Sequence, residues 1–477
     1  MGVRGGRRLG MVDTRGGPVT RAFFVICRHE WRVLCRDAGV GLAAVGVAAV
    51  VVAAIVAGGA TAESVRARVL EVDRARSKIV DGWREKATDW YGASATPLEV
   101  AAPPGPLAWL AVGQSDLAPP VATAFTWAGP DAMFAKVEPQ NPALLRVGRL
   151  DAAFVAIYLL PLLAIVVAYD LLTAEREQGT LALVLSQPLS LATLLAAKVA
   201  VRAVVVLGVV TLSAGAAAAW HPINAGSELW IAWLAVAAYV LLWLVLSAGV
   251  NLLVSSSAAG VLALGLVWLL SVIVVPAVAN SALSLAIPEP PRSTLIIGDR
   301  AADLDVSRRG RVVLDRYYHD HPELAPADPA NERGDRRRQL LLLYLEHEAA
   351  LRQVAAPFDA AVAARQRQLA AWAMLSPALV LQSALTTLAG TGPDDHRRFR
   401  EAAVTYVDRQ RAFFVPRIVQ AVPASGSDYA AFPDFEPRPA GNRLASAALD
   451  TAQLLFVTAV AALAVARGCR RYFAATP

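Results

Sequence analysis

Six apolar stretches, each long enough to cross a lipid bilayer, constrain this chain more than any other feature. A transmembrane helix needs about 20 mostly apolar residues, and within lipid only helices and closed barrels satisfy their backbone polar groups. The 477 residues are 56% hydrophobic, which is too apolar for an ordinary soluble protein. We therefore predict an all-α polytopic membrane protein, with transmembrane helices at residues 38–62, 152–169, 191–220, 229–253, 258–286 and 444–466.

Two long polar segments separate these stretches. In residues 63–151, apolar residues first recur at helical spacing, which predicts an amphipathic helix leaving the membrane, and prolines then break the pattern. Residues 287–443 are numerous enough to bury a core of their own. They contain helical patterns at 335–374 and 394–414 and a β-prone patch at 295–297. We predict two extracytoplasmic domains, a small one and a larger, mainly helical one.

Both ends of the chain are basic. Residues 1–37 carry eight arginines against three acids, and the last segment, 467–477, carries three arginines and no acid. Because positive charge accumulates on the cytoplasmic side, we predict that both segments are cytoplasmic, in a multi-pass membrane protein. This orientation accounts for the net charge of +6 better than nucleic-acid binding, which would need a basic stripe with interleaved aromatic residues.

The polar segment 170–190, which we name the elbow, lies between the second and third apolar stretches. We expect a short helix that Gly179 ends, since glycine adopts the left-handed conformation common after helices. Thr180 and Ser190 are candidate caps for the helices that follow. The apolar patch 181–185 gives the elbow a small hydrophobic face, which suits docking into a groove on a soluble partner. A charged loop that merely joins two spans is the alternative interpretation.

The elbow resembles the cytoplasmic coupling segment of ABC-2 type transporter permeases. The resemblance lies in an acidic turn, a Gly-Thr pair, an apolar stretch and a proline, formed by Glu175, Arg176, Glu177, Gln178, Gly179, Thr180, Leu181, Leu185 and Pro188. Many members have another acid after the Gly-Thr pair, where this chain has Ala182. The segments 317–324 and 376–391 also resemble the subgroup with a large external insertion before the last span, the domain-of-unknown-function 3526 group.

This resemblance implies a permease subunit, an exporter by class, that works with a separate ABC ATPase subunit dimer docked at the elbow. A second permease subunit, identical or related, would complete the transporter in the lipid bilayer, which for this class would be the bacterial inner membrane. The chain has no Gly-rich loop with Lys and Ser/Thr that could cradle nucleotide phosphates. We therefore expect no enzymatic activity, catalytic residue, metal or cofactor in this chain, with ATP bound by the partner. The movement produced is either substrate transport or a pull on the external domains.

Three charged residues lie within the apolar stretches. Lys198 and Arg202 are four residues apart on one helix face, so they either snorkel to the inner surface or contact anionic lipid or the acids of the elbow. Asp450 lies in the last stretch and is a candidate intramembrane acid, an interfacial residue or a polar helix contact. A secondary transporter would need more such residues on several spans, and a membrane receptor or scaffold would need no elbow. Both remain alternatives.

Overall fold

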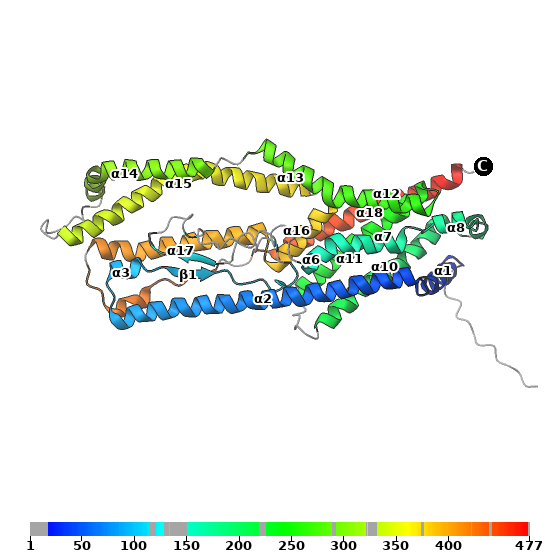
Figure 1. Cartoon of the computed structure of the whole chain (residues 1–477), viewed down its shortest axis with the longest axis horizontal. Coiled ribbons are helices and arrows are strands. Elements are labelled where there is room, and N and C mark those ends of the chain that lie inside the picture. Colours follow the sequence, from blue (N-terminus) through cyan, green and yellow to red (C-terminus); the bar gives the residue numbers. More distant parts are fainter. Residues whose placement is uncertain are drawn as a thin grey trace, which may run out of the picture.

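The computed structural model describes residues 18–111, 113, 121–127, 133, 150–187, 189–218, 226–288, 292–320, 322, 332–373, 376–420, 422–437 and 441–475. The molecule is elongated, with a bundle of long helices at one end and a second helical body, here named the distal unit, at the other (Figure 1). Helix α1 (Pro18–Leu34) and the C-terminal end of α18 lie together at the free end of the bundle, which we name the terminus end.

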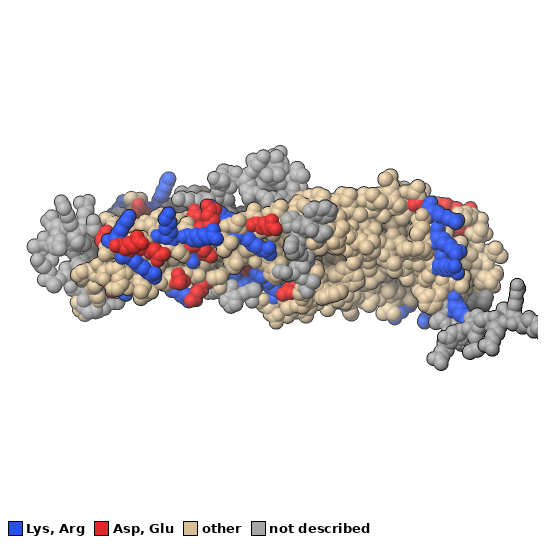
Figure 2. Space-filling view, turned by 90° about the horizontal axis from the view of Figure 1, so that it is seen from below, with Lys and Arg blue, Asp and Glu red and all other residues tan. Residues whose placement is uncertain are grey.

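Among the residues that the structure describes, six helices are long and apolar enough to cross a membrane. Over them lies a broad stretch of surface with few charged residues, between the charges of the distal unit and a basic band near the terminus end (Figure 2). The chain is therefore a multi-pass membrane protein. The six are α2 (Ala38–Lys86), α6 to α7 (Ala152–Phe154, η1 Val155–Leu159, Leu160–Ala168), α10 (Leu191–Ala218), α11 (Ser227–Leu253), α12 to α13 (Ser257–Trp268, η2 Leu269–Val274, Val275–Ala286) and α18 (Arg443–Ala475).

Helix α2 continues without a break from the bundle into the distal unit (Figure 1). Its 49 residues span about 74 Å at 1.5 Å per residue, whereas the hydrocarbon core of a bilayer is about 30 Å thick. Asp37 caps its start by accepting hydrogen bonds from the amides of Gly39 and Val40. The predicted amphipathic helix is therefore the second half of α2, and it fixes the distance between bundle and distal unit.

Prolines interrupt two spans, and each interruption is compensated by a hydroxyl group from another helix. Pro161 has no N–H to donate to the Ile157 carbonyl four residues earlier, and that carbonyl accepts a bond from Tyr239 Oη of α11 at 3.2 Å. Pro276 follows the π-helical segment η2, where the Ser271 carbonyl accepts a bond from Ser376 Oγ at 2.9 Å. Such compensation is required where no water can reach the backbone.

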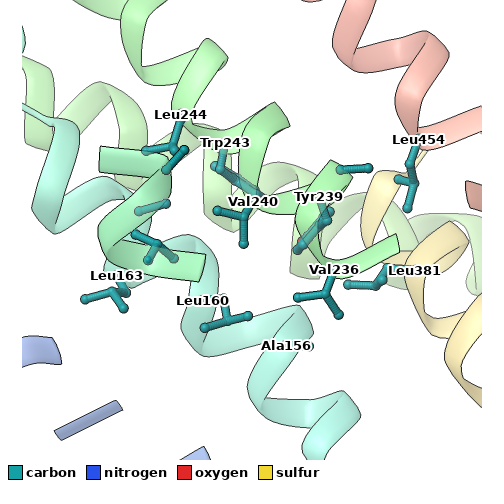
Figure 3. Close-up of a cluster of buried hydrophobic side chains, with 14 of the residues drawn as sticks. Ala156, Leu160, Leu163, Val236, Tyr239, Val240, Trp243, Leu244, Leu381 and Leu454 are labelled. Carbon is teal, nitrogen blue, oxygen red and sulfur yellow. The ribbon is translucent and has the colours of Figure 1, made fainter. Parts of the chain in front are cut away.

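One segment that the sequence analysis placed in the large external domain, without predicting a helix there, instead forms a helix that packs in the bundle. Helix α16 (Pro377–Ala389) contacts α11 and α18, and its buried residues join the bundle's hydrophobic core. Leu381 of α16 lies beside Val236 and Tyr239 of α11 and Leu454 of α18 (Figure 3). With 13 residues, α16 is too short to cross a bilayer, so it enters the bundle from the distal unit and returns.

The two predicted external domains share a single hydrophobic core. Trp83 of α2 packs against Phe414 of α17 (Pro393–Val419) and against Phe432, with ring centroids 6.1 and 5.3 Å apart. The Trp90 ring lies 4.9 Å from that of Tyr429, and its indole N–H donates to the Val422 carbonyl at 2.8 Å. Residues that precede the second span and residues that follow the fifth span therefore build one distal unit.

The distal unit is mainly helical. The 295–297 patch, predicted as β-prone, lies in a helix, and the helices predicted at 335–374 and 394–414 are both present. The strands, predicted nowhere, form an antiparallel pair in the proline-rich segment, with Leu98 opposite Ala124. The elements are α3 (Trp90–Ser94), β1 (Leu98–Ala101), β2 (Val121–Ala124), α14 (Arg292–Asp320), α15 (Glu332–Ala373), α17 (Pro393–Val419) and η4 (Gly426–Ala431).

Candidate functional site

The elbow lies at the terminus end, opposite the distal unit (Figure 1). It consists of two short helices, α8 (Thr173–Glu177) and α9 (Leu181–Leu185). Gly179 separates them with φ of +67°, which confirms the predicted helix end, because a side chain at this position would be strained.

The two predicted caps of the elbow differ in outcome. Ser190 Oγ accepts the Thr193 amide at 3.1 Å, as an N-cap of the following helix does. Thr180 stands at the N-cap position of α9 but makes no capping bond there, because its hydroxyl donates back to the Glu175 carbonyl at 3.4 Å. The cap prediction for Thr180 was therefore wrong. Pro188 lies outside the described residues.

Arg176 and Glu177 connect α8 to the turn between α11 and α12. Arg176 Nη1 donates to the carbonyls of Asn251, at 2.9 Å, and Val254, at the C-terminal end of α11. Glu177 accepts bonds from the Ser257 amide at 2.7 Å and the Ser257 hydroxyl at 3.0 Å, at the start of α12. A cation at a helix C-terminus and an anion at an N-terminus both complement the helix dipole.

Asn251 is a site residue that the sequence analysis missed. It is fully buried, and its Oδ1 accepts the Leu172 amide at 3.1 Å. Its Nδ2 donates to the Ala168 carbonyl at 3.2 Å. These bonds satisfy backbone groups at the end of α7, where a helix leaves its last carbonyl groups without partners inside the helix. An amide side chain within an uncharged apolar span was the sequence signal that could have identified it.

Glu175 reaches the third span. Its Oε1 forms an ion pair with Lys198 of α10, whose Nζ also donates to the Leu171 carbonyl at 2.8 Å. Arg202, one turn further along α10, donates from Nε to the Val167 carbonyl at 2.8 Å and lies 3.8 Å from the Asp170 carboxylate. Lys198 and Arg202 are only 4% and 5% exposed. The basic pair therefore contacts the acids of the elbow rather than reaching the surface.

Glu30 of α1 completes this group, which we name the buried charge cluster: Glu30, Asp170, Glu175, Lys198 and Arg202. Glu30 lies 2.8 Å from Arg202 Nη1 and 3.4 Å from Lys198 Nζ. Burial by itself raises the pKa of Glu30, but the two cations outweigh it and hold this pKa below its ordinary value. The sequence analysis did not single out Glu30. Its side chain joins α1 to the elbow through α10.

The elbow residues that are exposed at the surface are not the same set as the predicted coupling residues. Glu175 and Arg176 turn inward, Leu181 is buried, and Leu185 is partly buried. The exposed residues that have no bond to another span form what we name the elbow face, and Leu183, 69% exposed, is its largest apolar side chain. The elbow face consists of Gln178, Gly179, Ala182, Leu183, Ser186 and Gln187.

Asp450 does not belong to this site. It lies near the distal end of α18, beside Ser383 of α16. This is a polar contact between helices, one of the interpretations considered for it.

Comparison with known protein families gives a match over part of the distal unit. Residues 292–438 match the model of a family described as a domain of unknown function, DUF3526. No curated protein matches the chain. The matched segment includes α14 to α17 and η4 and ends before α18. The match therefore covers the second part of the distal unit together with α16, the helix that returns into the bundle.

Proposed function

We propose that the chain is the membrane-spanning permease subunit of an ABC-2 type transporter, in which a separate ATPase subunit dimer binds the elbow face. The observation that carries this proposal is the connection of one short elbow to several spans at once. Through Glu175, Arg176 and Glu177 it contacts α10, α11 and α12. A force on such a segment would displace three spans together, whereas a passive loop needs none of these bonds.

In this proposal the terminus end is cytoplasmic and the distal unit is extracytoplasmic, in the bacterial inner membrane. Closure of the ATPase dimer would push the elbow face, and the buried charge cluster would carry the displacement into α7 and α10. Helices α11 and α18 would pass it to α16, which they contact. Either a substrate or the distal unit itself would be moved, by two such subunits acting as a pair.

Copurification tests this function. Affinity-tagged chain, expressed from its native host with its neighbouring genes, is expected to retain an ATPase subunit. Leu183→Glu should abolish this retention, because Leu183 is exposed and the substituted glutamate would place a charge in the apolar centre of the elbow face. Leu253→Glu is the matched control, since Leu253 is 87% exposed at the same end of the bundle but lies outside the elbow.

Two results would count against the proposal. Retention of the ATPase by Leu183→Glu at the level of the control would exclude the elbow face as the docking site. Purification of the wild-type chain without any ATPase would favour a membrane receptor or scaffold.

A further inference from the structure

Helix α1 has two opposite faces. One face packs on α10: it carries Glu30 and Leu34, and Cys27 Sγ lies 3.8 Å from the Ala197 carbonyl. The other face is exposed and combines aromatic and basic side chains. This second face, here the α1 outer face, consists of Arg21, Phe24, Val25, Arg28, Trp31 and Arg32. At 100° per residue, the three arginines lie within about 40° of one another and about 180° from Glu30.

The position of α1 places this face beside the membrane boundary. Only Cys35, Arg36 and Asp37 separate α1 from the first membrane-length helix, so α1 stays within a short distance of the start of that span. Figure 1 shows α1 lying across the terminus end rather than along the spans. In Figure 2 a basic band crosses the molecule near this end, at the limit of the uncharged surface.

The composition of the α1 outer face selects its partner. Phe24 is 70% exposed and Val25 68%, which would be unfavourable in water alone. Within the described part of the chain, none of the three arginines forms an ion pair with an acid. Apolar and aromatic side chains that insert at the acyl boundary, next to cations at headgroup level, are the features of a helix lying on a membrane.

We propose that the α1 outer face binds the headgroups of anionic phospholipid. Each arginine near an anionic surface should favour that lipid by about fivefold. Because Glu30 projects from the opposite side of the same helix into the buried charge cluster, bound lipid holds Glu30 between Lys198 and Arg202. The lipid composition of the membrane would then set how firmly the elbow is joined to α10. This inference is independent of the ATPase and of the transport function.

Spin-labelled lipids test the proposal directly. The full-length protein is reconstituted in phosphatidylcholine vesicles containing traces of spin-labelled phosphatidylglycerol or spin-labelled phosphatidylcholine, and electron paramagnetic resonance gives the immobilised fraction of each. Wild type should immobilise phosphatidylglycerol several-fold more than phosphatidylcholine at low salt, and less so at high salt, because the headgroup contacts are screened.

Two charge-removal variants locate the effect. The triple variant Arg21→Gln, Arg28→Gln, Arg32→Gln should lose most of the preference. Its matched control removes three exposed cations from the distal half of α2 (Arg74→Gln, Lys78→Gln, Lys86→Gln) and should keep it. A triple Arg→Lys variant at the α1 positions retains charge, so it should keep the preference and shows that lost folding is not the cause.

Three results would overturn the proposal. Wild type with equal preference for the two lipids would assign the α1 outer face to a protein partner instead. If the Arg→Gln variant kept the same preference for phosphatidylglycerol as wild type, the anionic lipid would bind elsewhere on the protein. Loss of preference in the Arg→Lys variant would show that the helix, rather than its charge, was disturbed.

Discussion

Replacing Glu30 by Gln tests whether the buried charge cluster holds α1 on the bundle. The substitution keeps the size of the side chain and removes its charge. Glu30 is 7% exposed, and it lies within 3.4 Å of both Lys198 and Arg202. After the change, two buried cations would remain with the elbow acids Glu175 and Asp170 as their only anionic partners in the cluster.

Removing one partner of a buried ion pair costs about 3–5 kcal/mol. We expect the lower value, about 3 kcal/mol, because both cations keep carbonyl acceptors and an elbow acid. This cost falls on the docking of α1 rather than on the whole fold, since Glu30 is the only member of the cluster contributed by α1. A loss of about 3 kcal/mol corresponds to an increase of about a hundredfold in the population of the open state.

Hydrogen exchange followed by mass spectrometry on the reconstituted full-length protein measures this opening through peptides covering residues 21–34. Amide exchange there should accelerate by about two orders of magnitude in Glu30→Gln. His29→Gln is the control, because His29 is the exposed neighbour on the same helix. If Glu30→Gln exchanges no faster than His29→Gln, the cluster does not hold α1 and the argument is wrong.

The same peptides report on pH. The pKa of Glu30 in the folded protein is below its ordinary value of 4.5. Its stabilisation is therefore fully present above about pH 4.5 and is lost as the pH falls through the lower folded value. Protection of α1 in wild type, corrected for intrinsic exchange, should decline only in that acidic range. Glu30→Gln should show no such decline.

Two further predictions concern the distal unit. Trp83→Ala should destabilise this unit by about 3–5 kcal/mol, so that limited proteolysis becomes faster both near the β1 strand and in α17. Trp230→Ala is the control, because Trp230 is 71% exposed, and it should change neither rate. Faster cleavage in only one of the two segments would disprove the shared core. Burial, aided by the charge of Arg400, lowers the pKa of His396 below its ordinary value of 6.5. The contribution of neutral His396 to the stability of the folded protein is therefore present above about pH 6.5 and is lost as the pH falls through the folded pKa. Thermal unfolding of wild type should therefore shift to lower temperature on acidification below pH 6.5 by more than that of His396→Asn, and equal shifts would contradict the assignment.

The sequence by itself determined the features that depend on local pattern. Apolar runs of transmembrane length located the six membrane-length helices, because hydropathy over about 20 residues is a property of the run alone. Gly179 marked the end of α8 for an equally local reason, since its backbone conformation excludes other residues. The position of the elbow opposite the distal unit followed from the number of crossings between them.

Only the tertiary structure decided which residues meet. Glu30 and Arg202 are 172 positions apart, and nothing local to either one indicates the other. The apolar residues of the 13-residue helix α16 suit a soluble core as well as a membrane bundle, so only the space between α11 and α18 decided their place. Likewise, the sequence alone placed Trp83 and Phe414 in two separate domains, whereas their side chains share one core. Helical period fixes the face on which a side chain lies, but the packing of distant helices chooses its partner.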